Sequence, residues 1–325
     1  MRTNLILCIV LALALVICPV AALGSDAAEE KETVPATTET NKPAEDEEYI
    51  SVMSSSNGKI RKLGMREYII GCVAAEMSAD YHTEALKAQA VACYTYAKKT
   101  CEQNKKHKDS SLGNADITDS PDTHQAYLSQ KQRKEKWGEK SEEYEAKISA
   151  AVDEVSGCYI SYNGETALAV YHAISAGSTQ SADSLWNAEI PYLISVESPG
   201  DRLSPNYMST SKFTESEFKK IAKKCGANLD GDADEWLGKT EKSDSGYTLS
   251  VTFGENKIGA SKIRDEFGLR SLCFDVAYTG DEFVFTCRGY GHGVGMSQYG
   301  ADYMARQGFS WREILAHYYP GTDIV

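Results

Sequence analysis

The chain has 325 residues, of which 42% are hydrophobic and 25% charged, a balance typical of a folded globular protein rather than a disordered or fibrous one. Its 34 basic and 47 acidic residues give a net charge of −13, so the chain lacks the basic excess with which proteins neutralise nucleic-acid phosphates. We therefore expect no nucleic-acid partner.

The first 24 residues have the pattern of an export signal. Arg2 provides a positive charge, an apolar run extends from Leu5 to Leu23, and small residues stand at Ala22 and Gly24. The run is also long enough to cross a bilayer. Residues 1–24 are therefore predicted to be a cleaved signal peptide or an uncleaved anchor, with the rest of the chain outside the cytoplasm.

Residues 25–48 contain nine acidic and two basic residues and almost no large apolar side chains. Such a segment cannot bury enough surface to offset the entropy lost on ordering, so it is predicted to be a disordered acidic tether. The folded domain is then expected to cover residues 49–325. Its seven cysteines show no CxxC spacing, so no disulfide framework is indicated, and Cys72 and Cys93 are expected to pack as small hydrophobic residues.

The domain is predicted to begin with helices and to change to strands in its middle. A hairpin is expected around Asn163-Gly164, and Thr214 with Glu217 makes a capping box for a helix. The expected helices are residues 67–77, 84–99 with Thr83 as N-cap, 135–156 and 215–224, and two more close the chain. The expected strands are residues 158–162, 165–175, 246–253, 271–278 and 282–287. This order predicts an α+β fold, with helices at both ends of the chain packed around β-hairpins in one large catalytic domain.

Glu76 is the first candidate for chemistry because it lies in the last turn of an apolar helix. The negative end of the helix dipole and partial desolvation both disfavour its charged form, so its pKa is expected to be raised. A carboxylic acid that is still protonated near neutral pH can protonate the leaving oxygen of a glycosidic bond. Spacing alone leaves open that Glu76 is only a solvated residue at a helix end.

A glycine-rich segment at residues 288–302 is the second candidate. Five glycines allow close approach or positive φ, and His292 in its centre could donate to a sugar hydroxyl, move a proton or bind a metal. Residues 171–183 form a third, at a strand end with small hydroxylated side chains. A metal shared by His172, His292 and Asp183 is a weaker alternative. Ser175 or Ser297 as a triad nucleophile is weaker still, because neither lies in a GxSxG elbow.

With these segments together, the chain resembles the stage II sporulation protein D family, which includes amidase-enhancer proteins. The resemblance covers nearly all of residues 49–325. It is carried by REYIIGCVAAEMSADYHTEALKAQAVACYTYA (66–97), AVYHAISAGSTQSAD (169–183), GHGVGMSQYGA (291–301) and WREILAHYYPGTDI (311–324). One departure is Ser175-Ala-Gly177, where relatives usually read Ser-Gly-Gly.

The resemblance implies a peptidoglycan lytic transglycosylase that cleaves the MurNAc–GlcNAc bond of glycan strands stripped of stem peptides, during remodelling of the septal and engulfment wall in sporulation. Glu76 would be its catalytic acid and then its base. The residues implied to bind substrate are Tyr171, Ser175, Gly177, Gln89, Gly291, Gly293, His292, Ser297 and Gln298. No cofactor and no metal are expected, since the loop that carries a zinc-binding Cys pair in some relatives has only His107 and His124 here.

The resemblance also implies partners: glycan strands, a sporulation amidase and a membrane-protein complex. A dimer is left open. The alternative function is a non-catalytic wall-binding protein that stimulates an N-acetylmuramoyl-L-alanine amidase.

Overall fold

The structure, a computed structural model, describes residues 48–325. The predicted signal or anchor (1–24) and the tether up to residue 47 lie outside the described residues. The helices are α1 (Met65–Glu76), α2 (Thr83–Lys106), α3 (Gln130–Trp137), α4 (Ser141–Glu154), α5 (Ala182–Trp186), α6 (Glu215–Cys225), α7 (Ala260–Phe267), α8 (Gln298–Arg306) and α9 (Trp311–Tyr318). The strands are β1 (Tyr49–Met53), β2 (Ile60–Gly64), β3 (Ile117–Thr118), β4 (Ile160–Tyr162), β5 (Glu165–Thr166), β6 (Tyr171–His172), β7 (Met208–Thr214), β8 (Leu237–Lys242), β9 (Thr248–Phe253), β10 (Asn256–Gly259), β11 (Cys273–Tyr278), β12 (Glu282–Arg288), β13 (Met296–Ser297) and β14 (Asp323–Ile324). Among residues 48–325, no helix combines the length and apolarity needed to cross a membrane.

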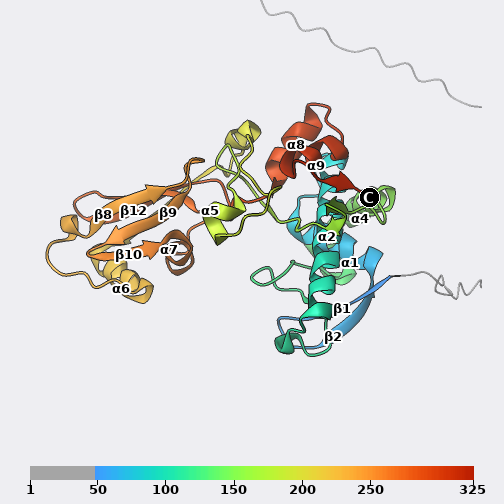
Figure 1. Ribbon diagram of the computed structural model, residues 1–325, viewed down its shortest axis with the longest axis horizontal. Coiled ribbons are helices and arrows are strands. Elements are labelled where there is room, and N and C mark those ends of the chain that lie inside the picture. The colour runs from blue at the N-terminus through green and yellow to red at the C-terminus, as the bar shows by residue number, and fades with distance from the viewer. Residues whose placement is uncertain (1–47) are drawn as a thin grey trace, which may run out of the picture. The chain divides into compact units, whose positions relative to one another are not determined.

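One hydrophobic core gathers helices from both ends of the described chain. Figure 1 shows α8 and α9 beside α2, although they are far apart in the sequence. Tyr68 and Val73 of α1, Leu86 and Val91 of α2, and Ile148 of α4 are all fully buried in it. The apolar helix α1 is therefore covered on most sides, as its composition predicts.

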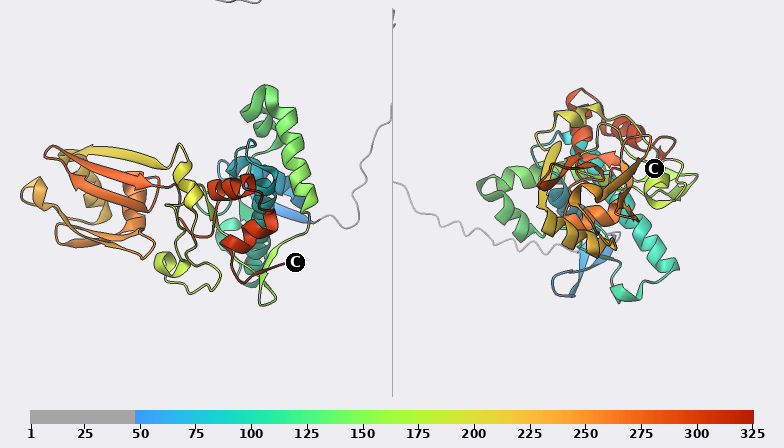
Figure 2. Two further views of the ribbon diagram at one scale, coloured as in Figure 1. Left: turned by 90° about the horizontal axis from the view of Figure 1, so that it is seen from above. Right: turned by 90° about the vertical axis from the view of Figure 1, so that its left-hand side faces the viewer.

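A second hydrophobic core lies among α6, α7 and two three-stranded sheets. The sheet orders are β11-β12-β7 and β10-β9-β8. Phe218 of α6 stacks on Phe283 of β12 with ring centroids 3.8 Å apart, and Phe267 of α7 packs against both Phe218 and Phe285. Figure 2 shows these yellow and orange elements grouped together from two further sides.

A short parallel pair of strands brings two sequence motifs together. β6 pairs with β13, so that Tyr171 lies opposite Met296 and His172 opposite Ser297. Two isolated β-bridges, Ile174 with Tyr290 and Gln180 with Val294, connect the same two segments. The segment after β6 and the glycine-rich segment before β13 therefore lie side by side.

The predicted α+β class is confirmed, as are several local features. Asn163 and Gly164 form the turn between β4 and β5 with φ of 51° and 79°. Thr214 and Glu217 form both hydrogen bonds of the capping box at α6. Cys72 and Cys93 are fully buried free thiols.

Several boundaries differ from the predictions. The expected helix 135–156 is two helices, because Gly138 takes φ +56° between α3 and α4. α2 runs on to Lys106, and its N-cap is His82, whose side chain accepts the Glu84 N–H, rather than Thr83. The sheet of β1, β2 and β3 was not predicted, and α6 and α7 lie in the middle of the chain, so helices are not confined to its ends.

The expected strand 165–175 is reduced to β5 and β6. Backbone groups between them bond elsewhere: the Leu168 N–H donates to the Tyr192 hydroxyl and the Val170 carbonyl accepts the Tyr319 hydroxyl. Side chains brought in from other parts of the fold thus replace a sheet partner.

The segment 125–128 is fixed against α1. A Cβ at Gly71 would lie 2.2 Å from the Tyr127 ring, so only glycine allows this ring to pack on the helix. The fully buried Arg133 donates to the Leu128 carbonyl at 2.9 Å and forms ion pairs with Glu67 and Glu145. These contacts set the position of the backbone that faces Glu76.

Candidate active site

Glu76 is the last residue of α1 and is partly buried. Its Oε1 accepts the Ala126 N–H at 3.2 Å. Burial raises the pKa of Glu76 above its ordinary value of 4.5, and this effect is opposed by hydrogen bonds from Ala126 and Gln298 and by the charge of Lys136. The predicted direction of the shift is confirmed. A raised pKa keeps more of the acid form at neutral pH, as a proton donor requires.

Glu76 lies where two cavities adjoin. Both cavities are also lined by Ala173, Tyr290 and Gln298. One, of about 400 Å³, includes Tyr81, Asn206, Arg270 and Tyr299, and we call it the Tyr81 half. The other, of about 920 Å³, includes Asp122, Tyr171, His172, Arg264, Gly291 and His292, and we call it the His292 half. Together they form a groove with a carboxyl group at its middle.

Tyr290 is the exposed aromatic residue shared by the two halves. Its side chain is 45% exposed, and the Arg270 guanidinium lies 5.4 Å from its ring centroid. An aromatic ring with one polar end suits the alternating apolar faces and hydroxyl edges of sugars. Tyr290 lies in the glycine-rich segment, but the sequence did not distinguish it from its neighbours.

Close packing explains the glycines of this segment. Gly291, Gly293 and Gly295 all have positive φ. A Cβ on Gly295 would lie 2.0 Å from the Val170 carbonyl oxygen, and one on Gly293 would lie 2.5 Å from the Tyr247 ring. Gly291 lines the groove, whereas Gly293 is buried beside Tyr247 and is not among the lining residues.

His292 is held by backbone hydrogen bonds on its ring. Its Nδ1 accepts the Val294 N–H at 3.1 Å, and the ring also bonds the Tyr171 backbone. Burial, together with the Arg264 charge, lowers the pKa of His292 to about 4. The ring is therefore neutral near pH 7 and lies with its centroid 5.7 Å from that of Trp186.

His172 lies beside His292, with ring centroids 5.7 Å apart. Burial lowers the pKa of His172 to about 3, and its Nε2 is buried without a hydrogen-bond partner in the described part of the chain. Within residues 48–325 no group of three or more His, Cys, Asp or Glu side chains is placed to hold a metal ion, so the structure does not bring His172, His292 and Asp183 together as ligands.

A short hydrogen-bond chain connects the motifs to Glu76. The Gln298 amide bonds Glu76 and also donates to Gln89 Oε1 at 3.4 Å. Gln298 lines both halves of the groove, while Gln89 is fully buried behind it. Tyr171 lines the His292 half, and its hydroxyl accepts the Gln125 amide at 2.9 Å.

Ser175, Gly177 and Ser297 lie below the surface of the groove rather than among its lining residues. The two serines share one partner, Asp201, a fully buried carboxylate that the sequence analysis missed, and the Gly177 N–H donates to the Ser175 hydroxyl. Asp201 Oδ1 accepts the Ser297 hydroxyl at 2.8 Å, and Oδ2 accepts the Ser175 N–H at 3.1 Å. The position of these residues favours a role in bracing the motifs, and their predicted role in substrate binding stays a prediction.

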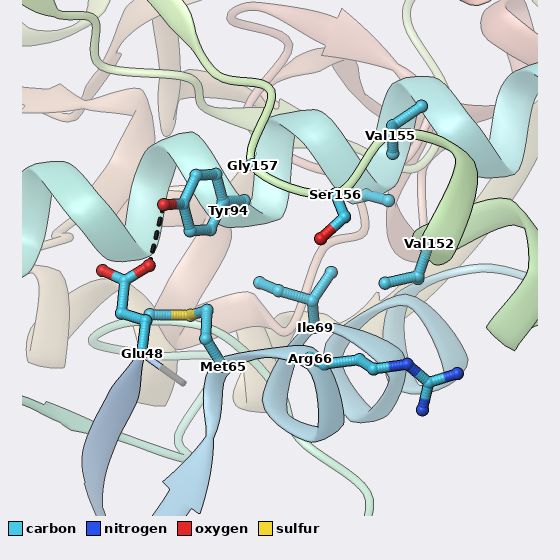
Figure 3. Close-up of a pocket in the computed structure, with 10 residues that line it drawn as sticks. Glu48, Met65, Arg66, Ile69, Tyr94, Val152, Val155, Ser156 and Gly157 are labelled. Carbon is cyan, nitrogen blue, oxygen red and sulfur yellow. Dashed lines mark hydrogen bonds between the residues drawn. The ribbon is translucent and has the colours of Figure 1, made fainter. Parts of the chain in front are cut away.

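A separate cavity of about 290 Å³ lies at the start of the described chain (Figure 3). Glu48, Met65, Ile69 and Tyr94 are among its lining residues, and the Tyr94 hydroxyl donates to Glu48 Oε2 at 2.8 Å. None of the residues of the two-part groove lines it. We therefore place the chemistry in the groove and not in this cavity.

Comparisons with known proteins agree with the sequence motifs. A family model described as "Stage II sporulation protein" matches residues 53–162. The chain is 36% identical to Stage II sporulation protein D of Bacillus subtilis over 276 residues, which is 85% of this chain and 78% of that protein. The protein of the same name from Bacillus amyloliquefaciens gives the same figures. The Amidase enhancer of Bacillus subtilis is 26% identical over 304 residues, 78% of this chain and 40% of that protein.

Proposed function

The chain belongs to the stage II sporulation protein D family, and from this premise we propose that it is a peptidoglycan lytic transglycosylase that acts on glycan strands during sporulation. The observation that carries the proposal is the partly desolvated Glu76 at the junction of the two groove halves. A sugar chain that lies along the groove would therefore pass next to this carboxyl group.

The proposed reaction needs one carboxyl group. Glu76 protonates the oxygen between MurNAc and GlcNAc, and the bond to the anomeric carbon breaks. The muramyl 6-hydroxyl attacks that carbon while Glu76, now a carboxylate, takes its proton, so a 1,6-anhydro ring closes without consuming water. The neutral His172 and His292 add no positive charge near the cationic transition state.

The mass of the products tests this reaction. We expect the purified protein, incubated with glycan strands stripped of stem peptides, to release fragments one water lighter than hydrolytic ones. Asp122 and Asp265 also line the His292 half and are exposed. Fragments with ordinary reducing ends would overturn the lyase assignment and make these two residues candidates for the second carboxylate of a hydrolase.

The pH dependence should follow the acid form of Glu76. Because burial raises the pKa of this group, kcat/KM is expected to fall as pH rises through a midpoint above 4.5. His292 and His172, with pKa values of about 4 and 3, stay neutral over that limb. A pH–rate profile of product release checks this, and activity that rises over the same interval would contradict Glu76 as the initial acid.

The alternative is a non-catalytic wall-binding protein that stimulates an amidase. The observation that favours it is the similarity to the Amidase enhancer. It predicts that the purified protein releases no fragments, and that Glu76→Gln stimulates an added amidase as well as the wild type does.

We further propose that the domain works outside the cytoplasm, secreted or held at the membrane by residues 1–24. There it would act beside a sporulation amidase and a membrane-protein complex. The export pattern of the N-terminus and the family membership support this placement.

A further inference from the structure

We propose that Arg264 binds the lactyl carboxylate of a peptide-free MurNAc residue in the His292 half of the groove. The inference rests on the proposed function, because only a peptidoglycan strand carries this group. It goes further by naming the side chain that would distinguish a stripped strand from one that still carries stem peptides.

Arg264 is positioned by the second hydrophobic core. It lies on α7, whose Ile263 and Phe267 are buried in that core. Its side chain is 31% exposed and lines the same cavity as Glu76 and His292. Its charge also acts on His292, which places the guanidinium near that ring. A cation on α7 therefore lines the same half-groove as Glu76 at the end of α1.

Among residues 48–325, Arg264 has almost no partners. Its Nε is buried without a hydrogen-bond partner among residues 48–325, and its Nη1 lies 3.7 Å from an oxygen of Asp265, whose side chain is 72% exposed. Such a long, exposed contact contributes little. Arg66 and Arg288, in contrast, donate to carboxylates at 2.6 and 2.7 Å. The partly exposed guanidinium of Arg264 is therefore not taken up by a short ion pair among residues 48–325 and can bind a carboxylate ligand.

The chemistry of muramic acid matches this free guanidinium. A stem peptide is attached through an amide to the lactyl group, and its removal leaves a carboxylate there. An arginine fork binds a carboxylate through two parallel hydrogen bonds, whereas a neutral amide accepts fewer and weaker ones. Asp122 and Asp265 line the same cavity, and their carboxylates would repel this ligand. A stripped strand therefore needs a cation in this half, and Arg264 supplies it.

Arg270 is a poorer candidate for the same role. It lines the Tyr81 half, and its guanidinium already lies over the face of Tyr290. This cation–π contact with Tyr290 already occupies the Arg270 guanidinium, whereas Arg264 has no such contact among residues 48–325.

The test measures binding and does not depend on turnover. The full chain, carrying Glu76→Gln to prevent cleavage, is titrated with three oligosaccharides of equal length: peptide-free GlcNAc–MurNAc strands, the same strands with each lactyl carboxylate converted to an N-methylamide, and chitin oligosaccharide. Adding Arg264→Gln is expected to weaken binding of the carboxylate strand roughly 10- to 100-fold, the range of a charged hydrogen bond. Binding of the other two should change less than about threefold.

Two further variants complete the design. Lys262→Gln removes a positive charge from an exposed position on the same helix and is expected to leave all three affinities unchanged. Arg264→Lys keeps the charge without the fork, so it should restore part of the lost affinity. An equal loss for all three ligands, or no loss for the carboxylate strand, overturns the role of Arg264.

The outcomes separate this inference from the proposed function. If the wild type releases anhydro fragments equally well from carboxylate and amidated strands, the transglycosylase stands and the inference fails. If no fragments appear but Arg264 still discriminates between the strands, the catalytic proposal fails and the recognition site stands. If no strand binds at all, both fail.

Discussion

Glu76→Gln is expected to lower the release of anhydro fragments by roughly 10²- to 10⁴-fold, the range of a positioned acid–base group. The loss should fall on kcat, because Glu76 serves both proton transfers and glutamine keeps the shape of the side chain without transferring a proton. The Ala126 N–H keeps an acceptor in the glutamine carbonyl oxygen. Initial rates of fragment release, followed by mass spectrometry, give the comparison.

Asp122→Asn is the matched control, since it removes a carboxylate that lines the same cavity. It should retain most of the activity. The unfolding midpoint of Glu76→Gln should not fall, because the mutation removes a carboxyl group whose charged form is disfavoured by burial. A variant that keeps wild-type rates would remove Glu76 from the mechanism, and an equal loss in Asp122→Asn would indicate a pair of carboxylates instead.

The features that the sequence predicted correctly are those encoded locally. Asn163-Gly164 specifies a tight turn through positive φ at two adjacent residues, and Thr214 with Glu217 specifies a helix start within four residues. Glu76 could be singled out because the apolar residues before it predict a buried helix with a carboxyl group at its end. The glycines near His292 indicated that the backbone packs closely against its neighbours, and Gly295 lies against the Val170 carbonyl, where no Cβ would fit.

The features that it missed depend on contacts between distant parts of the chain. Asp201 is 26 residues from Ser175 and 96 from Ser297, so no spacing pattern connects them. Arg264 lies on an amphipathic helix that carries several charged residues, so nothing in the local sequence distinguishes it from the others. Only the fold brings it to the cavity of Glu76. The strand expected at 165–175 was shortened because the Tyr192 and Tyr319 hydroxyls occupy its backbone groups. Such competition is visible only once the tertiary structure is known.

Asp201→Ala is expected to lower the free energy of unfolding by roughly 2–4 kcal/mol, because it leaves the buried Ser175 N–H and Ser297 hydroxyl without their acceptor. The two carboxylate oxygens join the segment after β6 to the start of α8, where Gln298 bonds Glu76. Activity should therefore fall as well, even at temperatures where the variant is folded. Denaturant titration measures the first effect, and kcat/KM at low temperature measures the second.

Further variants distinguish the loss of the Asp201 hydrogen bonds from general damage to the core. Ser297→Ala removes one of the two donors and should destabilise less, and the double variant with Asp201→Ala should be less destabilised than the sum of the two, since they share one hydrogen bond. Asp201→Asn keeps the volume and one acceptor and should fall between the wild type and Asp201→Ala. If the double variant is fully additive, Ser297 and Asp201 are not coupled. The segments that carry Ser175 and Gln298 would then be joined by the strand pairing at β6 and β13 and by the neighbouring backbone contacts.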